Sequence, residues 1–257
     1  MTVKTVRQNV FGLELSVNIK ENEHRGNSKG DILFIHGLGC SKESYKEAFS
    51  YSKFAQYRLI AIDLPGYGAS SKPKDLCYDM QEHADFLKEI TEKLDIKNPI
   101  IMGHSMGGAV ALLLIKQLDS IKYFFSLEGN LTDDDCAISR ETAVLPMEEF
   151  LTSEYPQNFM KYRCRRRKID PDPDPLAFYK SSVSLVEMSD SGELLEQYRD
   201  LPYPKTYIYG DENRHSKTVA LLQGEDIVEV PDSGHFMMNE NPEFCYDQIA
   251  KRMEEVI

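Results

Sequence analysis

Short runs of apolar residues alternate along this chain with stretches whose apolar positions recur at helical spacing. The first two runs, 3–10 and 13–19, are rich in Val, Leu and Ile, and the Phe-Gly pair between them predicts a turn that joins two strands. Further apolar runs predict strands over 32–35, 57–62, 99–102, 123–127, 206–209 and 227–230, and amphipathic stretches predict helices over 78–94, 106–118, 216–222 and 242–256. Strands that alternate with helices indicate an α/β fold with a mostly parallel, doubly wound sheet.

The alternation is interrupted between residues 130 and 204. This segment holds an acidic run at 133–135, a basic run at 163–168, a proline-punctuated stretch at 171–175 and a helical pattern at 176–186. A connection of this length inside a compact domain is usually functional. We therefore expect residues 1–129 and 205–257 to form one core, and residues 130–204 to form a mainly helical cap inserted over one end of the sheet.

Residues 103–107 read Gly-His-Ser-Met-Gly and match the pattern G-x-S-x-G. The apolar run 99–102 leads straight into them, and a helical stretch leads straight out. A serine on so tight a strand-to-helix turn takes a strained backbone conformation, and the flanking glycines remove side chains that would clash there. The turn raises the Ser105 hydroxyl above the sheet edge, where the helix N-terminus favours developing negative charge. This setting indicates a nucleophile rather than an ordinary glycine-rich helix start.

Three further motifs occur in order around this turn. Residues 36–39 read His-Gly-Leu-Gly after the third strand, residues 63–70 read Asp-Leu-Pro-Gly-Tyr-Gly-Ala-Ser after the fourth, and residues 233–236 read Ser-Gly-His-Phe before the last helix. With these motifs the sequence resembles the α/β-hydrolase superfamily over nearly its whole length. The resemblance implies an α/β-hydrolase fold, an oxyanion motif at 36–39 and a catalytic histidine at position 235. Such motifs are more specific for fold than for substrate.

Ser105 and His235 are the predicted catalytic pair. A serine hydroxyl is a weak nucleophile until a base removes its proton, and histidine is the side chain that titrates near neutral pH. The two residues are far apart in sequence, but a parallel sheet brings both to the carboxyl edge of its strands. The attacked carbonyl develops an oxyanion, for which the backbone N–H groups of Leu38 and Met106 are the expected donors.

The third member of a catalytic triad departs from the commonest pattern of the superfamily. Most members carry an aspartate three residues after a glycine that closes the penultimate strand, and here Asn213 holds that position. An amide cannot balance the charge of a histidinium ion. Two carboxylates can take its place: Glu128, which follows the strand after the nucleophile helix, and Asp211. Because some members of the superfamily place their acid at the first of these positions, we favour Glu128 and keep Asp211 as the alternative acid.

A Ser–His–acid triad with an oxyanion hole indicates acyl transfer to water, with a carboxylic ester or thioester as the substrate. An epoxide hydrolase or haloalkane dehalogenase that resembles this chain would normally need an aspartate at position 105. The expected cap offers six aromatic residues that either line an apolar acyl pocket or form the cap's own core: Phe150, Tyr155, Phe159, Tyr162, Phe178 and Tyr179. Two alternatives stay open, an acyltransferase that uses the same triad and a non-catalytic receptor that keeps the pocket for a small ligand.

Composition narrows the possible partners. The chain has 257 residues, with 42 acidic and 30 basic side chains and a net charge of −12, which disfavours a nucleic-acid partner. No apolar run is long enough to span a membrane, the N-terminus does not read as a signal peptide, and the five cysteines are scattered, so we expect a cytoplasmic protein. The basic run 163–168 is interpreted as a solvated helix face, with an acidic substrate group or partner as the alternative.

The remaining histidines show no spacing typical of a metal site, and the glycines at 37 and 39 lack the third glycine of a dinucleotide loop. Neither a metal nor another cofactor is therefore expected. We expect His36 to organise the loop after the third strand, and His104 to pack inside the turn around Ser105. The other three lie in polar stretches and are expected at the surface: His24, His83 and His215.

Overall fold

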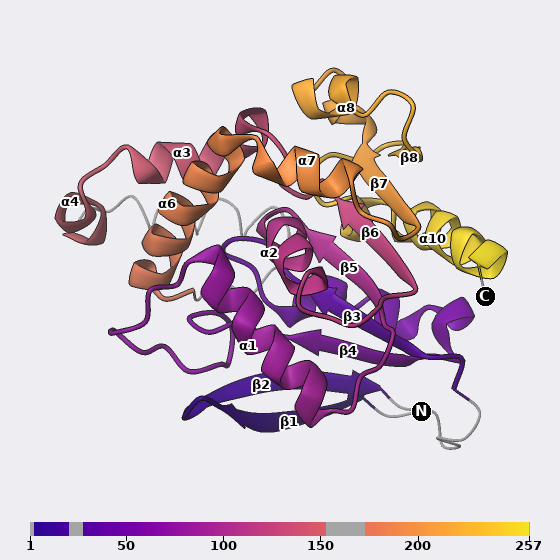
Figure 1. The fold of residues 1–257 in the computed structure, drawn as a ribbon, viewed down its shortest axis with the longest axis horizontal. Coiled ribbons are helices and arrows are strands. Elements are labelled where there is room, and N and C mark those ends of the chain that lie inside the picture. The colour runs from indigo at the N-terminus through magenta and orange to yellow at the C-terminus, as the bar shows by residue number, and fades with distance from the viewer. Residues whose placement is uncertain (1–2, 21–27, 153–172, 257) are drawn as a thin grey trace.

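The computed structural model of this chain describes residues 3–20, 28–152 and 173–256. Its strands form one eight-stranded sheet in the order β1-β2-β4-β3-β5-β6-β7-β8 (Figure 1). The strands are β1 (Val3–Val10), β2 (Leu13–Lys20), β3 (Asp31–Ile35), β4 (Arg58–Ile62), β5 (Ile100–His104), β6 (Tyr123–Leu127), β7 (Lys205–Gly210) and β8 (Ile227–Val230). β2 pairs antiparallel with both β1 and β4, and the strands from β4 to β8 pair in parallel. The predicted α/β fold with a mostly parallel sheet is confirmed.

Helices cover both faces of this sheet. Those outside the long insertion are α1 (Met80–Lys93), α2 (Met106–Ile115), α8 (Lys217–Leu221), α9 (Met237–Glu240) and α10 (Pro242–Val256), with short 3-10 turns η2 (Lys42–Tyr45), η3 (Ala48–Ser50), η4 (Ser52–Phe54) and η6 (Asp211–Asn213). Leu33 and Ile35 of β3 pack in the same apolar layer as α1 and α2, whereas Ile32 and Phe34 pack in the layer that contains α10. All four side chains are fully buried. This alternation is the period of two that a strand covered on both faces requires.

The insertion between β6 and β7 is mainly helical in its described part. It comprises η5 (Asp133–Cys136), α3 (Ala137–Ala143), α4 (Met147–Thr152), α6 (Pro175–Ser191) and α7 (Glu193–Arg199). Figure 1 shows α3, α4 and α6 together at one end of the molecule, whereas α7 runs back toward the sheet. The side chains of Leu194 and Tyr198 on α7 belong to the same apolar layer as α1 and α2. The Tyr198 ring lies 6.1 Å from that of Phe124 on β6 and 6.3 Å from that of Tyr207 on β7, so α7 packs against the sheet.

Local sequence explains where α6 begins and ends. The Asp174 carboxylate accepts hydrogen bonds from the N–H groups of Leu176 and Ala177, and Pro175 occupies the first turn, where no intrahelical donor is needed. The helix stops at Gly192, which has a φ of 79°, a left-handed conformation that favours glycine. Three residues at its two ends thus set the length of the longest described helix in the insertion.

Four of the predicted elements have the predicted bounds in the structure: β1, β6, β8 and α10. The other elements shift at their ends, most visibly α2, which stops at Ile115 instead of continuing to residue 118. The basic run 163–168, the aromatic residues Tyr155, Phe159 and Tyr162, and His24 lie outside the described residues. Within residues 3–20, 28–152 and 173–256, no helix combines the length and the apolarity that crossing a bilayer requires.

Candidate active site

In the turn between β5 and α2, the surrounding backbone leaves no room for a side chain at the positions two residues before and two residues after Ser105. Ser105 has φ 53° and ψ −124°, and its N–H donates to the carbonyl of Leu127 at 3.1 Å. A Cβ atom on Gly107 would lie 2.2 Å from the carbonyl oxygen of Ile35, and one on Gly103 would lie 2.5 Å from that of Gly107. Both positions therefore require glycine, and the strained conformation of Ser105 is fixed by the strands around it.

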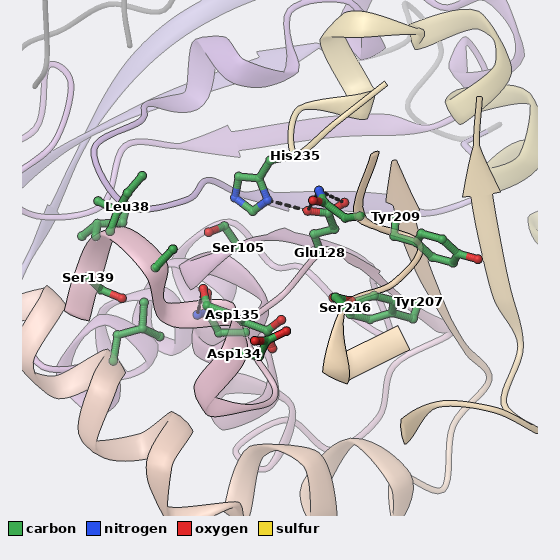
Figure 2. Close-up of a pocket in the computed structure, with 15 residues that line it drawn as sticks. Leu38, Ser105, Glu128, Asp134, Asp135, Ser139, Tyr207, Tyr209, Ser216 and His235 are labelled. Atoms are coloured by element: carbon green, nitrogen blue, oxygen red, sulfur yellow. Dashed lines mark hydrogen bonds and ion pairs between the residues drawn. The ribbon is translucent and has the colours of Figure 1, made fainter. Parts of the chain in front are cut away.

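Glu128 follows β6 directly and is held in an unusual backbone conformation as well. Its φ is 40°, and its N–H donates to the carbonyl of Ile208 on the neighbouring β7 at 2.8 Å. Only 8% of the residue is exposed. From this position the carboxylate reaches His235, whose Nδ1 lies 2.6 Å from Glu128 Oε2 (Figure 2). The short distance is typical of a charge-assisted hydrogen bond, in which the imidazole N–H donates to the carboxylate.

Two further donors hold the same carboxylate. The N–H of Gly210 donates to Glu128 Oε1 at 2.9 Å, and the side-chain amide nitrogen of Asn213 lies 2.9 Å from Oε1 and 3.0 Å from Oε2. Burial acts to raise the pKa of Glu128, but the hydrogen bond and charge of His235 and the bonds from Asn213 and Gly210 outweigh it. The pKa of this carboxyl is therefore lowered, and Glu128 is ionised at neutral pH.

Asp211, the alternative acid, points elsewhere. Its carboxylate accepts a hydrogen bond from the N–H of Ser233 at 3.1 Å and lies 3.6 Å from the guanidinium of Arg214. The Ser233 N–H is the main cause of the lowered pKa of Asp211. Of the two carboxylates considered from the sequence, Glu128 thus contacts His235. Asp211 instead bonds to the loop that precedes His235.

Ser105, Glu128 and His235 line one cavity of about 320 Å³. The remaining lining residues come from the loop after β3, from the insertion and from the β7 side: Leu38, Asn130, Asp134, Asp135, Ala137, Ile138, Ser139, Leu185, Tyr207, Tyr209, Asn213 and Ser216. Figure 2 shows Ser105 next to the His235 ring, with Leu38 on one side of the cavity and Tyr207 and Tyr209 on the other. Met106 is the first residue of α2, so its N–H has no acceptor within the helix.

Of the two interpretations of the insertion's aromatic residues, packing in a core applies to the three that lie among the described residues: Phe150, Phe178 and Tyr179. Phe150 and Phe178 stack on each other with ring centroids 6.1 Å apart, and Tyr179 lies 5.4 Å from Phe150. None of the three is among the lining residues. These aromatic side chains pack in the apolar layer that also contains α1 and α2, and the part of the insertion that lines the cavity is a mixture of apolar, hydroxyl, amide and carboxylate groups.

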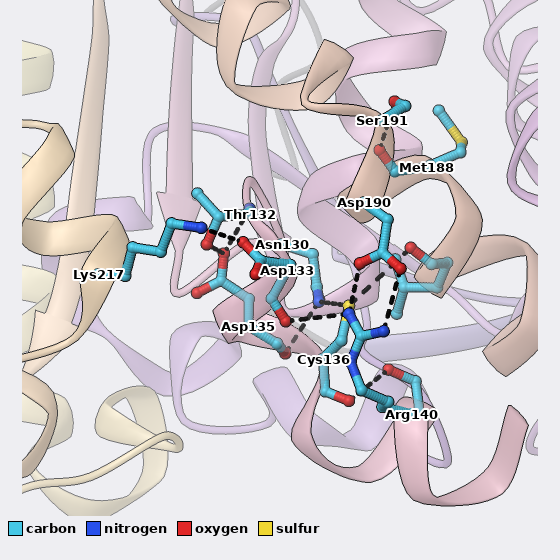
Figure 3. A network of polar contacts seen from close by, with 12 residues as sticks. Asn130, Thr132, Asp133, Asp135, Cys136, Arg140, Met188, Asp190, Ser191 and Lys217 are labelled. Carbon is cyan, nitrogen blue, oxygen red and sulfur yellow. Dashed lines mark hydrogen bonds and ion pairs between the residues drawn. The ribbon is translucent and has the colours of Figure 1, made fainter. Parts of the chain in front are cut away.

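The polar wall of the cavity is fixed by a network that joins the insertion to α8 (Figure 3). The Asp135 carboxylate accepts hydrogen bonds from the N–H groups of Leu131 and Thr132 and from the hydroxyl of Thr218, each at 2.8 Å. Burial raises the pKa of Asp135. Lys217 of α8 forms an ion pair with Asp133, so Lys217 and Thr218 of α8 both contact the acidic run at 133–135. The network explains why three consecutive acidic residues occur at this point.

Among the described histidines other than His235, three are buried: His36, His83 and His104. His36 accepts a hydrogen bond from the N–H of Leu64 at 3.1 Å, and His104 Nε2 lies 2.8 Å from the carbonyl oxygen of His235. Both therefore support the loops around the cavity, as expected. The surface position predicted for His83 is wrong, because its side chain is fully buried and its Nε2 lies 3.1 Å from Ser181 Oγ. His215 is exposed.

A signal for the burial of His83 was present in the sequence. Met80, Ala84 and Leu87 recur at the spacing of one helical face, and position 83 falls on that face. Burial lowers the pKa of His83 to about 3, so the ring is neutral near neutral pH. Within the described ranges of the chain, no group of three or more His, Cys, Asp or Glu side chains is placed to hold a metal ion.

The sequence model of the alpha/beta hydrolase family matches residues 32–248 of the chain. The chain belongs to the alpha/beta hydrolase family. This match extends from β3 to α10 and therefore includes every residue that lines the cavity.

Among the curated members similar to this alpha/beta hydrolase is the uncharacterized hydrolase YugF of Bacillus subtilis, 24% identical, with 91% of this chain and 93% of that protein covered. The "Probable lysophospholipase BODYGUARD 2" of Arabidopsis thaliana is 35% identical over 114 residues, which are 42% of this chain and 24% of the plant protein. The chain thus spans only about a quarter of the length of that plant relative.

Solved structures of the same fold resemble this alpha/beta hydrolase over its whole length. A mutant of the N-acyl homoserine lactonase AidH complexed with N-hexanoyl homoserine has a TM-score of 0.79 at 16% identity, with 99% of this chain and 98% of that chain covered. The haloalkane dehalogenase DatA from Agrobacterium tumefaciens has a TM-score of 0.76 at 19% identity, with 99% and 97% covered. At such identities the likeness concerns the fold.

Proposed function

We propose that this chain is a serine hydrolase that cleaves a carboxylic ester or thioester through an acyl-enzyme on Ser105. His235 is the base that activates the serine, and Glu128 is the acid that orients the histidine. The observation that carries the proposal is the 2.6 Å hydrogen bond between His235 Nδ1 and Glu128 Oε2, at a cavity that Ser105 also lines. A histidine bound through Nδ1 presents its Nε2 to the other side of the ring, where a serine proton can be accepted.

The proposed reaction follows from these groups. Ser105 Oγ attacks the substrate carbonyl carbon while His235 Nε2 takes the hydroxyl proton, and the Glu128 carboxylate stabilises the resulting imidazolium. The carbonyl oxygen becomes an oxyanion that accepts hydrogen bonds from the N–H groups of Leu38 and Met106. When the tetrahedral intermediate collapses, the carbon–oxygen or carbon–sulfur bond breaks and the leaving group takes the proton from His235. Water then attacks the acyl-enzyme by the same sequence and releases the carboxylic acid.

The substrate class rests on the cavity and on the relatives. A cavity of about 320 Å³ suits a small molecule with a short acyl group, and its mixed lining suits an acyl group that is not purely apolar. One relative is named a probable lysophospholipase, and two fold neighbours are named as a lactonase and an esterase. These names support hydrolysis of an ester as the reaction proposed here. A haloalkane dehalogenase such as the fold neighbour DatA would normally need an aspartate at position 105. The serine at this position therefore does not favour dehalogenase chemistry.

We further propose that residues 130–204 act as a cap over Ser105. Ala137 and Ile138 of α3 and Leu185 of α6 line the cavity that Ser105 also lines. Segments that connect a rigid scaffold across its active edge commonly determine which substrates enter. In this proposal the core of residues 1–129 and 205–257 supplies the reacting groups, and the cap supplies the acyl contacts.

Hydrolysis of p-nitrophenyl butyrate by the purified chain tests the proposed function. We expect turnover by the wild type, and a loss of about 10⁵–10⁶-fold in kcat for Ser105→Ala, as for nucleophile deletions in other serine hydrolases. Ser191→Ala is the matched control, because it removes an exposed hydroxyl at the end of α6 and should leave the rate unchanged. A wild type that binds the ester without turnover would instead indicate a receptor, and a fully active Ser105→Ala would contradict the serine mechanism.

A further inference from the structure

The side chain of Asn213 points its amide group at the carboxylate of Glu128. Its nitrogen lies 2.9 Å from Oε1 and 3.0 Å from Oε2, and the residue belongs to η6, the turn that directly follows β7. The identity of the atom that faces Glu128 is fixed by chemistry, because an ionised carboxylate only accepts hydrogen bonds and the amide oxygen has no proton to give. Asn213 is therefore a donor to the Glu128 carboxylate.

We propose that Asn213 is a positioning residue that holds the Glu128 carboxylate in register with His235. This inference rests on the proposed function, in which Glu128 orients His235. Three donors surround the carboxylate, from the side chains of His235 and Asn213 and from the N–H of Gly210. Gly210 contacts only Oε1, whereas Asn213 contacts both oxygens. Removal of Asn213 therefore leaves Oε2 with His235 as its single partner among these three.

A glutamate needs this support more than an aspartate does. Its side chain has one more rotatable bond, so a larger set of rotamers must be restricted before the carboxylate stays in one place. Glu128 also projects from β6, the strand next to β7, and its backbone is already in a left-handed conformation with a φ of 40°. The donors at positions 210 and 213, on the β7 side of Glu128, hold the Glu128 side chain in the conformation in which it reaches His235.

The amide at position 213 also suits the charge of the site better than a carboxylate would. A second carboxylate about 3 Å from Glu128 would repel it, and one of the two would keep its proton at neutral pH. An amide supplies a donor without adding charge. The residue that replaces the usual aspartate of the superfamily thus complements an acid that has moved to the neighbouring strand.

Kinetics of four forms of the full chain test this role: the wild type, Asn213→Leu, Glu128→Gln and the double variant. Leucine has the same number and branching of side-chain heavy atoms as asparagine but no donor, so we expect kcat for p-nitrophenyl butyrate to fall about 10–100-fold, the usual effect of losing a group that orients a site residue. KM should change less than kcat, because the Asn213 amide group is bonded to Glu128 and acts on the reaction through His235. In the Glu128→Gln background the same substitution should cause no further loss, since Asn213 acts only through Glu128.

Two controls separate positioning from structural damage. His215→Gln changes an exposed residue two positions away and should leave kcat unchanged. Asn213→Ala removes the same donor from a half-buried side chain, so it serves where Asn213→Leu does not fold, and the same loss of kcat is expected.

Two results would overturn the positioning role: an unchanged kcat in both Asn213 variants, or an equal loss in the Glu128 and Glu128→Gln backgrounds. Failure of the proposed function looks different. In that case the wild type hydrolyses no ester, or Glu128→Gln keeps the wild-type rate before Asn213 is changed at all.

Discussion

The carboxyl edge of the sheet and the insertion of residues 130–204 contribute to the same cavity in different ways. At the sheet edge, backbone geometry fixes the functional groups: Ser105 and Glu128 each follow a strand directly, and both have a positive φ. In the insertion, helices α3 and α6 supply the side chains of Ile138 and Leu185, which line the same cavity. The difference teaches that the proposed reacting groups have little freedom to move or to be replaced, whereas the proposed acyl contacts can change with one side chain.

The two regions are also joined differently to the rest of the chain. The sheet edge is held by hydrogen bonds between neighbouring strands, such as that from the N–H of Glu128 to the carbonyl of Ile208. The insertion has a backbone bond of this kind from Asp174 to Gly66, but its contacts with α8 and α1 use side chains: Asp133 and Asp135 contact α8, and Ser181 contacts His83. Side-chain contacts respond to pH and to substitution more readily than strand pairing does, so we expect the two regions to respond differently to each.

The largest effect is expected at the sheet edge, from substitution of the acid. Glu128→Gln keeps the shape of the side chain but removes its charge, so it should lower kcat by about 10⁴-fold, as amide replacement of a triad acid does. Asp211→Asn should have little effect, because Asp211 bonds to Ser233 and Arg214 instead. Steady-state hydrolysis of p-nitrophenyl butyrate near neutral pH measures both. A large loss in Asp211→Asn with an active Glu128→Gln would reverse the assignment of the acid.

The second largest effect is expected on the pH dependence of stability, from His83 at the contact between α1 and the insertion. The pKa of His83 is lowered to about 3, mainly by burial and further by His36, from an unfolded value near 6.5. Because the folded pKa is the lower one, the stability contributed by neutral His83 is fully present above pH 6.5 and is lost as the pH falls toward 3. Between pH 7 and pH 5 this single group should lower the free energy of unfolding by about 2 kcal/mol.

Urea unfolding of three forms measures that contribution. The wild type and His215→Gln should lose stability between pH 7 and pH 5, whereas His83→Gln should lose about 2 kcal/mol less over the same range, since its amide does not titrate. If the free energy of unfolding of His83→Gln and of the wild type depends on pH in the same way, the burial of His83 does not lower stability between pH 7 and pH 5.

The smallest effect is expected from the insertion's contacts with substrate. Ile138→Ala enlarges the cavity beside Ser105, so the ratio of kcat/KM for a hexanoyl ester to that for an acetyl ester should rise by about 10-fold, the scale of small changes in an apolar pocket. Phe178→Ala is the matched control, because Phe178 packs on Phe150 away from the cavity. It should lower stability and affect all esters equally. A change of chain-length preference in Phe178→Ala alone would move the acyl site into the insertion's core.

Much of the sheet could be predicted because its strands and turns are determined by residues that are neighbours in the sequence. A fully buried strand such as β6 is a short apolar run with sharp ends, and the turn around Ser105 needs glycine at positions where a Cβ would meet backbone. The insertion was harder to predict, because aromatic residues that pack on each other have the same pattern as residues that line a pocket. The donor role of Asn213 could not be predicted either, since sequence identifies an amide but not which of its two ends faces a neighbour.

The central claim is that Ser105 forms a covalent acyl-enzyme, and labelling with a fluorophosphonate tests it most directly. Activated serine attacks the phosphorus of the probe and displaces fluoride, so mass spectrometry of the digested protein reports which residue reacted. We expect one adduct per chain, on the peptide that contains Ser105, together with its absence in Ser105→Ala and its strong slowing in Glu128→Gln. An adduct on another residue, or equal labelling of the wild type and Ser105→Ala, would contradict the account.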